Sequence, residues 1–283
     1  MNLWEALFLG LVQGLTEFLP ISSSAHLRII GEFLPSAKDP GAAFTAIIQI
    51  GTELAVLVYF RREVWAIVKS WTLSWKQGGR PKDRDAQMGW LIIVGSVPIV
   101  VLGFLFQDSI ETHLRNLYIT GAMLIGFALL LGAADAYAGR RAARIRPKEL
   151  DGIGLGDGLL YGLAQALALI PGVSRSGGTI TAGLAMGYSR EAAARYSFLL
   201  AMPAVFGAGL LELVKALGEE TALEAGWGNT IAAGVTAFAV GYVVIIAFLK
   251  IVSTYSYRPF VYYRLVLGAV VITLLATHVL YPS

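Results

Sequence analysis

The fold is decided by a short polar stretch at residues 171–179, which reads Pro-Gly-Val-Ser-Arg-Ser-Gly-Gly-Thr. It lies between two apolar runs, residues 158–170 and 180–187. Each run is shorter than the roughly 20 residues that a helix needs to cross a bilayer. Arg175 is therefore expected at membrane depth, where an arginine costs about 2.5–3.5 kcal/mol on insertion scales. We expect an anionic group to meet it there.

A second stretch of the same design lies near the N-terminus, at residues 13–26. It reads Gln-Gly-Leu-Thr-Glu-Phe-Leu-Pro-Ile-Ser-Ser-Ser-Ala-His and again separates two half-length apolar segments. It contributes a carboxylate, Glu17, and an imidazole, His26. We therefore predict that the two stretches meet and form one polar site inside a membrane protein.

Composition supports the membrane assignment. Of the 283 residues, 56% are hydrophobic and 14% are charged, whereas soluble domains have about 25% charged residues. The apolar residues form long blocks, which predicts a single all-α polytopic integral membrane domain over residues 1–283. The net charge of +3 comes from basic residues clustered in two loops, which indicates membrane topology and no nucleic-acid partner. The absence of cysteine excludes disulfide and thiol chemistry.

The apolar blocks predict six transmembrane helices and two re-entrant helical hairpins. The spans are expected at residues 44–60, 89–106, 117–137, 190–214, 229–250 and 260–281, with Ser189 capping the fourth. The hairpins are expected from the half-length pairs 2–19 with 23–34 and 155–170 with 177–187. The residues between the first two spans are expected to form a polar loop.

The two halves of the chain resemble each other. Residues 10–15 are similar to residues 162–167, and each segment is followed by a proline, Pro20 or Pro171, and a serine-rich turn. The order of elements predicts an inverted-topology repeat, with repeat 1 at about 2–106, repeat 2 at about 117–250, and a further C-terminal span. Such repeats place their site near the bilayer midplane, at the repeat interface.

Loop charges predict the orientation in the membrane. The basic loops hold Arg61, Arg62, Lys69, Lys76, Arg80, Lys82 and Arg84, and then Arg140, Arg141, Arg144, Arg146 and Lys148. The other loops hold Asp108 and Glu111 with Arg115, and Glu219, Glu220 and Glu224. Basic loops favour the cytoplasm, so we expect both termini outside, the first hairpin entering from the outer face and the second from the cytoplasmic face.

Three polar residues of the N-terminal half are candidates for chemistry. Gln13 and Glu17 are four residues apart and share a helix face. Glu17 fits a general base, a metal ligand or a positioning group, although a carboxylate that merely reaches the interface has the same pattern. His26 fits a group that protonates a leaving phosphate or deprotonates a serine. His113 and His278, near span ends, are read as structural.

The stretch around Arg175 has the features of a phosphate site. Arginine presents a planar fork to phosphate oxygens, glycines allow close backbone approach, and helix N-termini favour anions. The candidate binding residues are Ser22, Ser23, Ser24, Gly172, Ser174, Ser176, Gly177 and Thr179. Two alternatives stay open: Arg175 pairs with Glu17 alone, and many of the hydroxyls only cap helices.

The first full span adds Gln49 and Glu53, again four residues apart. A carboxylate inside the membrane is a functional candidate by default, although Glu53 could instead pair with Arg175 or Arg195. If a metal takes part, this oxygen-rich site suits Mg²⁺ or Ca²⁺, bridging phosphate and Glu17.

Residues 13–26 and 171–179 resemble the two signature motifs of undecaprenyl-pyrophosphate phosphatase, the bacitracin-resistance family. The similarity extends over the whole chain and includes Ile48-Gln49-Ile50-Gly51. The family's first motif is Glu or Gln, three residues, then Glu. This chain has the amide option, Gln13, which leaves one carboxylate where a mechanism with a carboxylate pair needs two.

The resemblance implies an interlocked inverted repeat, often dimeric, in the bacterial cell membrane. It implies hydrolysis of a C55 isoprenoid diphosphate at the extracytoplasmic face, which recycles the cell-wall lipid carrier. It further implies Glu17 and His26 as acid–base or metal-positioning residues and Arg175 as the diphosphate clamp. It implies a serine nucleophile, with Ser23 the first choice and Ser174 the second, while the residues leave attack by water open.

Two other classes compete with the phosphatase. An isoprenoid-phosphate transporter or flippase would use the same Arg/Ser/Glu site, since inverted repeats and broken helices are common in transporters. A structural membrane scaffold would leave Arg175 and both serine-rich breaks without a purpose. Release of orthophosphate separates the phosphatase from the transporter.

Overall fold

The computed structural model describes residues 1–35, 41–76, 78, 81, 83–106, 110–114, 116–218 and 225–282. Several residues used for the topology prediction lie outside this set: Arg80, Lys82, Asp108, Arg115, Glu219, Glu220 and Glu224, together with the side chains of Glu111 and His113.

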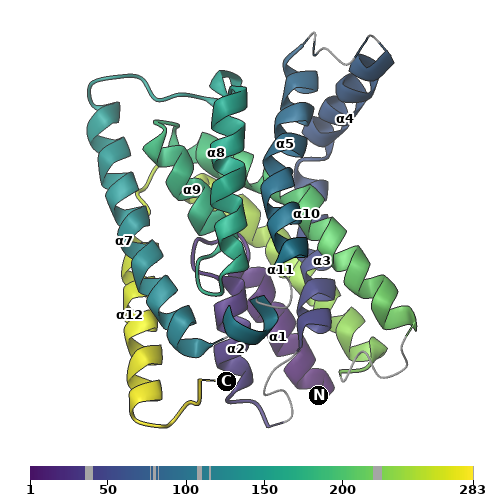
Figure 1. Ribbon diagram of the computed structural model, residues 1–283, viewed down its shortest axis with the longest axis vertical. Coiled ribbons are helices and arrows are strands. Elements are labelled where there is room, and N and C mark those ends of the chain that lie inside the picture. Colours follow the sequence, from purple (N-terminus) through teal and green to yellow (C-terminus); the bar gives the residue numbers. More distant parts are fainter. Residues whose placement is uncertain are drawn as a thin grey trace.

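Most of the described residues lie in helices (Figure 1). The helices of the first half are α1 (Leu3–Thr16), α2 (Ser23–Gly31), α3 (Ala42–Tyr59), α4 (Arg61–Lys76), α5 (Arg84–Leu105), the π-helical turn η1 (Ile110–Leu114) and α7 (Leu117–Ala142). Those of the second half are η2 (Leu150–Gly152), α8 (Leu155–Ala166), η3 (Leu167–Leu169), α9 (Arg175–Ala185), α10 (Arg190–Gly218), α11 (Trp227–Val252) and α12 (Arg258–Ala276).

A multi-pass membrane protein is confirmed by these helices. Among the described residues, α5, α7, α10, α11 and α12 are each long and apolar enough to cross a membrane. A sixth span results if α3 and α4 are counted together, although the chain bends by 84° between them. Every predicted span overlaps one of these helices, and Ser189 accepts a hydrogen bond from Ala192 N (3.1 Å), which confirms it as the cap of α10.

Some predicted boundaries were wrong. The polar loop expected after the first span is largely the helix α4, because Ile67 and Ser74 recur on one face and are buried against α5. The helix expected at 2–19 ends at Thr16 and is followed by a turn that contains Pro20. The helix expected at 177–187 begins earlier, at Arg175, because the Ser174 side chain caps it.

The two helix–break–helix units occupy corresponding places in the bundle. Helix α1 packs against α11, and α8 packs against α5. A Cβ atom at Gly10 would lie 2.4 Å from the Ala233 carbonyl oxygen, and one at Gly162 would lie 2.4 Å from the Gly95 carbonyl oxygen. Both contacts therefore require glycine, as is typical where membrane helices approach closely.

Figure 1 shows α1 with α2 and α8 with α9 approaching the middle of the molecule from opposite ends. Both chain termini lie at one end, and the C-terminal end of α4, the N-terminal end of α5 and the α7–α8 connection lie at the other. Ser176 Oγ donates a hydrogen bond to the Leu19 carbonyl oxygen (3.1 Å), so the tips of the two units are in direct contact.

The two breaks share an unusual backbone geometry. Ser22, which caps α2, has φ 72°, and Ser174, which caps α9, has φ 70°. Positive φ is uncommon for residues other than glycine. Each serine side chain accepts a hydrogen bond from the helix that it caps, from Ala25 N (3.4 Å) and Gly177 N (3.1 Å) respectively. Both breaks thus end in a serine with positive φ that caps the following helix.

A buried arginine that sequence analysis missed connects the breaks. Arg264 of α12 has no exposed surface. Its guanidinium donates to carbonyl oxygens of the first break (Pro20 O, 3.0 Å) and of the second (Gly172 O, 2.8 Å; Val173 O, 3.1 Å). It also donates to α7, at Met123 O and Leu124 O. Backbone groups at membrane depth must find partners within the protein, and Arg264 supplies them.

We expect Arg264→Met to destabilise the protein by more than about 3 kcal/mol, because several buried carbonyl groups lose their donor at once. The apparent melting temperature of the detergent-solubilised protein, followed by tryptophan fluorescence, should fall by about 5 °C or more. Arg258→Met is the matched control, since Arg258 is exposed at the start of the same helix. Equal melting temperatures for both variants would contradict this role of Arg264.

Candidate functional site

The tips of the two units enclose a cavity of about 220 Å³. One part of its wall is polar and is formed by Glu17, Ser22, Ser23, Ser24, Gln49, Ser174 and Arg175. The other part is apolar and is formed by Ile99, Ala168, Leu169, Ala204, Val205 and Ala208. The cavity therefore brings both predicted stretches together and offers a charged surface beside an apolar one.

Glu17 is the centre of the polar wall. Its Oε1 accepts a hydrogen bond from Arg175 Nη2 (2.8 Å). Its Oε2 accepts from Gln13 Nε2 (2.8 Å) and from Ser23 Oγ (2.6 Å). The expected pairing of Arg175 with an anionic group is thus present. The short bond from Ser23 also puts a carboxylate where it can receive the proton of a serine hydroxyl.

Further hydroxyls surround this pair. Ser22 Oγ lies 3.3 Å from Ser24 Oγ, and Ser174 Oγ lies 3.2 Å from Ser176 Oγ. Two of the serines cap helices, in line with the alternative kept open from the sequence. Ser23 has a different role, because its hydroxyl donates to Glu17. The N-termini of α2 and α9 both open toward the cavity through their capping serines, an arrangement that favours anions.

His26 is held away from this group. Its Nδ1 lies 2.7 Å from the Ser22 carbonyl oxygen, which can only accept, so Nδ1 donates. Its Nε2 lies 2.6 Å from the Tyr263 hydroxyl, and the two rings stack with centroids 5.6 Å apart. His26 is absent from the described residues that line the cavity. The geometry links it to the Ser22 turn, and its acid–base role remains a prediction.

Three predicted binding residues determine the backbone conformation of the second break. Thr179 Oγ1 donates to the Arg175 carbonyl oxygen (2.8 Å) and contacts Ser197 Oγ (2.5 Å). Gly172 has φ 92°, a conformation suited to glycine. A Cβ at Gly177 would lie 2.7 Å from Arg264 Nη1. These residues shape the turn around Arg175.

The two predicted site residues of α3 line different cavities. Gln49 lines the main cavity. Glu53 lines a smaller cavity that also touches Glu17 and Arg175. Arg195, the other partner considered for Glu53, instead donates to Glu63 Oε2 (2.7 Å).

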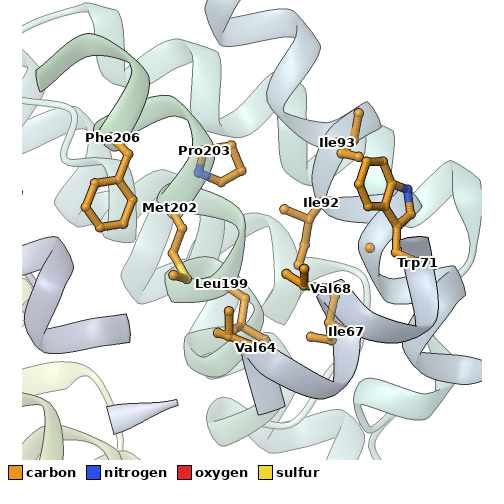
Figure 2. A pocket seen from close by; sticks show the side chains of 11 residues that line it. Val64, Ile67, Val68, Trp71, Ile92, Ile93, Leu199, Met202, Pro203 and Phe206 are labelled. Carbon is orange, nitrogen blue, oxygen red and sulfur yellow. The ribbon is translucent and has the colours of Figure 1, made fainter. Parts of the chain in front are cut away.

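A separate apolar cavity of about 290 Å³ lies between α4, α5 and α10 (Figure 2). On α10 it is lined by Leu199, Met202, Pro203 and Phe206, which recur at helical spacing on one face. The main cavity contacts the opposite face, through Ala204, Val205 and Ala208. The two cavities are therefore separate, and the indole of Trp71 is the one polar side chain among the described residues that line the apolar cavity.

The donor set limits what metal could bind. The described residues contain no group of three or more His, Cys, Asp or Glu side chains that could hold an ion. Glu17 already accepts three hydrogen bonds, and a carboxylate has about four acceptor positions. The site therefore fits an ion bound by one protein carboxylate, with phosphate oxygens and water as the other ligands, as is common for Mg²⁺.

Sequence reasoning missed Arg264 and Tyr263, which hold the breaks and His26 from α12. An arginine within the apolar span 260–281 was the available signal, because a charged side chain at membrane depth marks a functional or structural partner.

Comparison with known proteins agrees with this geometry. Residues 6–270 match the family model described as bacitracin resistance protein BacA. The chain is 60% identical over 280 residues to undecaprenyl-diphosphatase 2 of Agrobacterium fabrum, covering 99% of this chain and 98% of the relative. It is 59% identical to an undecaprenyl-diphosphatase of Pseudarthrobacter chlorophenolicus, covering 97% and 98%. The chain therefore belongs to the bacitracin resistance protein BacA family.

Proposed function

We propose that this protein hydrolyses undecaprenyl diphosphate to undecaprenyl phosphate and inorganic phosphate. The observation that carries the proposal is the Ser23–Glu17–Arg175 chain of hydrogen bonds in the wall of the cavity. The names of its relatives, undecaprenyl-diphosphatase, support the same reaction. Hydrolysis recycles the cell-wall lipid carrier and thereby confers resistance to bacitracin.

The cavity suits a substrate with a charged head and an apolar tail. Arg175 and the N-termini of α2 and α9 would bind the diphosphate and stabilise charge on the transferred phosphoryl group. Ser22, Ser24, Ser174 and Ser176 would add hydroxyl donors. The apolar wall at Ile99, Leu169 and Val205 would receive the first isoprene units, reached laterally from the lipid.

In the reaction, Ser23 Oγ attacks the terminal phosphorus and its proton passes to Glu17 Oε2. The bond between the terminal phosphorus and the bridging oxygen breaks, and undecaprenyl phosphate leaves. Water then hydrolyses the phosphoserine. Gln13 holds the carboxylate of Glu17 in position, and His26 holds the Ser22 turn through its hydrogen bond to the carbonyl oxygen.

We expect Ser23→Ala and Glu17→Gln each to lower kcat by at least about 100-fold, because nucleophile and base are lost. Arg175→Lys should lower kcat/KM by a similar factor, because the planar fork is replaced by a point charge. Phosphate release from C15 and C55 isoprenoid diphosphates by the detergent-solubilised protein measures both effects.

Ser253→Ala, at the exposed end of α11, is the matched control and should keep full activity. After acid quenching, mass spectrometry should find phosphate on Ser23 in the wild type. A fully active Ser23→Ala variant would exclude serine attack and leave attack by water.

We also propose that Glu17 supplies the one protein carboxylate for Mg²⁺ or Ca²⁺, which would neutralise charge on the diphosphate. Chelation with excess EDTA should then abolish phosphate release, and either ion should restore it. Turnover that persists unchanged in EDTA would show that the reaction needs no metal ion.

The finer architecture that we propose is an inverted-topology repeat with six spans and two re-entrant hairpins, α1–α2 and α8–α9, assembled as a homodimer as the family resemblance implies. Equivalent packing of α1 on α11 and α8 on α5 supports the repeat. With the basic connections in the cytoplasm, both termini lie outside and the site opens to the extracytoplasmic face.

This orientation is open to cysteine labelling, since the chain has no cysteine of its own. We expect Leu3→Cys, and a cysteine added after Ser283, to react with a membrane-impermeant maleimide in intact cells. Ala143→Cys, in the α7–α8 connection, should react only after permeabilisation. The reverse pattern would invert the proposed topology.

A flippase would use the same phosphate-binding residues without cleavage. It is not favoured, because the relatives are named for the diphosphatase activity and Ser23 already donates to a carboxylate.

A further inference from the structure

The hydroxyl of Tyr263 is a polar group beside the first break that the reaction has not used. Tyr263 lies on α12, directly before Arg264, and is 45% exposed. Its hydroxyl oxygen lies 2.6 Å from Nε2 of His26, which is only 6% exposed. The planes of the two rings differ by 6°. Tyr263 therefore reaches the first break through the imidazole ring of His26.

The partners of His26 determine where the proton of its ring lies. Nδ1 donates to the Ser22 carbonyl oxygen, which can only accept. In a neutral ring Nε2 then has the lone pair, and it accepts from the Tyr263 hydroxyl. Both of these partners are uncharged, whereas a buried imidazolium would need a charged partner, so the contacts fit the neutral ring. The Tyr263 hydroxyl thus keeps the proton of His26 on Nδ1.

The Ser22 carbonyl group connects His26 to Ser23. It accepts two hydrogen bonds from His26, one from Nδ1 (2.7 Å) and one from the backbone nitrogen (3.2 Å). Because a peptide bond is planar, holding this oxygen also holds the backbone nitrogen and Cα of Ser23. Ser22 has φ 72°, a conformation that costs about 1–3 kcal/mol and persists only where the surroundings hold it. Two hydrogen bonds in series thus lead from Tyr263 to the backbone of Ser23.

The second break forms the same backbone without an imidazole. Ser174 has φ 70° and caps its helix in the same way, and its carbonyl oxygen accepts from Gly178 N (2.8 Å). Gly178 is four residues after the capping serine, as His26 is in the first break, and has no side chain to donate. The residue that directly follows the capping serine also differs, since it is Arg175 here and Ser23 in the first break. The imidazole is thus present at the break that carries the serine hydroxyl.

We propose that Tyr263 is a positioning residue for the attack by Ser23 and that it acts through His26. This inference rests on the proposed function. By keeping His26 a donor to the Ser22 carbonyl oxygen, the hydroxyl fixes the peptide bond before Ser23. It thereby fixes the direction in which the Ser23 hydroxyl points to Glu17. Placement matters at this atom, because an error of about 1 Å in a reacting group can cost roughly 100-fold in rate.

The first test compares Tyr263→Phe with the wild type in phosphate release from a C15 isoprenoid diphosphate. The variant keeps the aromatic ring and loses only the hydroxyl. We expect kcat to fall roughly 10- to 100-fold with KM nearly unchanged, because Arg175 and the other phosphate-binding groups are untouched. Tyr262→Phe is the matched control, since it makes the same change one residue away, at a side chain that is 65% exposed. It should keep the wild-type kcat and KM.

A spectroscopic measurement separates positioning from packing. The chain has three histidines, so His113→Gln with His278→Gln leaves His26 as the only one. In ¹⁵N NMR spectra of this histidine-labelled protein in detergent, we expect a protonated Nδ1 and an Nε2 that accepts a hydrogen bond. Adding Tyr263→Phe should shift the Nε2 resonance, because its donor is lost, and the tautomer with the proton on Nε2 should become visible. Adding Tyr262→Phe should leave the spectrum unchanged.

The two measurements together decide the proposal. A Tyr263→Phe enzyme with wild-type kcat would overturn it, even if the spectrum changes. A lower kcat with an unchanged His26 spectrum would overturn it too, since the hydroxyl would then act by another route. An equal loss of kcat in Tyr262→Phe would have the same consequence. If the wild type itself releases no phosphate, the proposed function fails instead, and the spectra still show whether Tyr263 sets the tautomer of His26.

Discussion

The hydrogen bonds of Arg264 are the constraint on which the site depends. A break between two buried helices leaves carbonyl groups that need donors within the protein, and in this chain two such breaks lie in contact. One guanidinium donates to Pro20 O of the first break and to Gly172 O and Val173 O of the second. Because one planar guanidinium donates to carbonyl oxygens of both breaks, it provides their hydrogen-bond donors and also fixes the two breaks relative to each other. Ser23 and Arg175 directly follow the capping serines of these breaks and inherit that placement.

Charge pairing then decides what the polar wall can do. Arg175 and Glu17 are both largely buried, and their pairing offsets part of the desolvation that both groups suffer. Such a pair is useful at a phosphate site because a bound diphosphate can replace Glu17 as the partner of the Arg175 guanidinium. Glu17 would then be released as a base while it still accepts from Ser23 and Gln13. Without substrate, Arg175 and Glu17 therefore stabilise each other in the wall of the cavity.

The sequence was sufficient to predict the helical spans, the two breaks and the meeting of residues 13–26 with residues 171–179, since these follow from apolar length and from the placement of proline, serine and arginine. It was not sufficient for α4, because a basic amphipathic helix and a basic loop have the same composition. Nor could it place Arg264 on the breaks. Every residue has a backbone carbonyl group, so the sequence does not show which carbonyl groups accept hydrogen bonds from an arginine. His26 was predictable in part. Its position near the site follows from the sequence, but its hydrogen bond to Tyr263 depends on how α12 packs.

The amide at position 13 gains its meaning from the geometry. Gln13 Nε2 donates to Glu17 Oε2 at 2.8 Å, whereas a carboxylate at this distance would repel Glu17 unless the two shared a proton. The amide therefore fixes the orientation of the Glu17 carboxyl group at rest, at the cost of a second acid–base group beside it. The other carboxyl group near the ion pair is that of Glu53, which lines a smaller cavity together with Glu17 and Arg175. It stands apart from the three hydrogen bonds that hold Glu17, so the orientation of Glu17 depends on Gln13, Ser23 and Arg175.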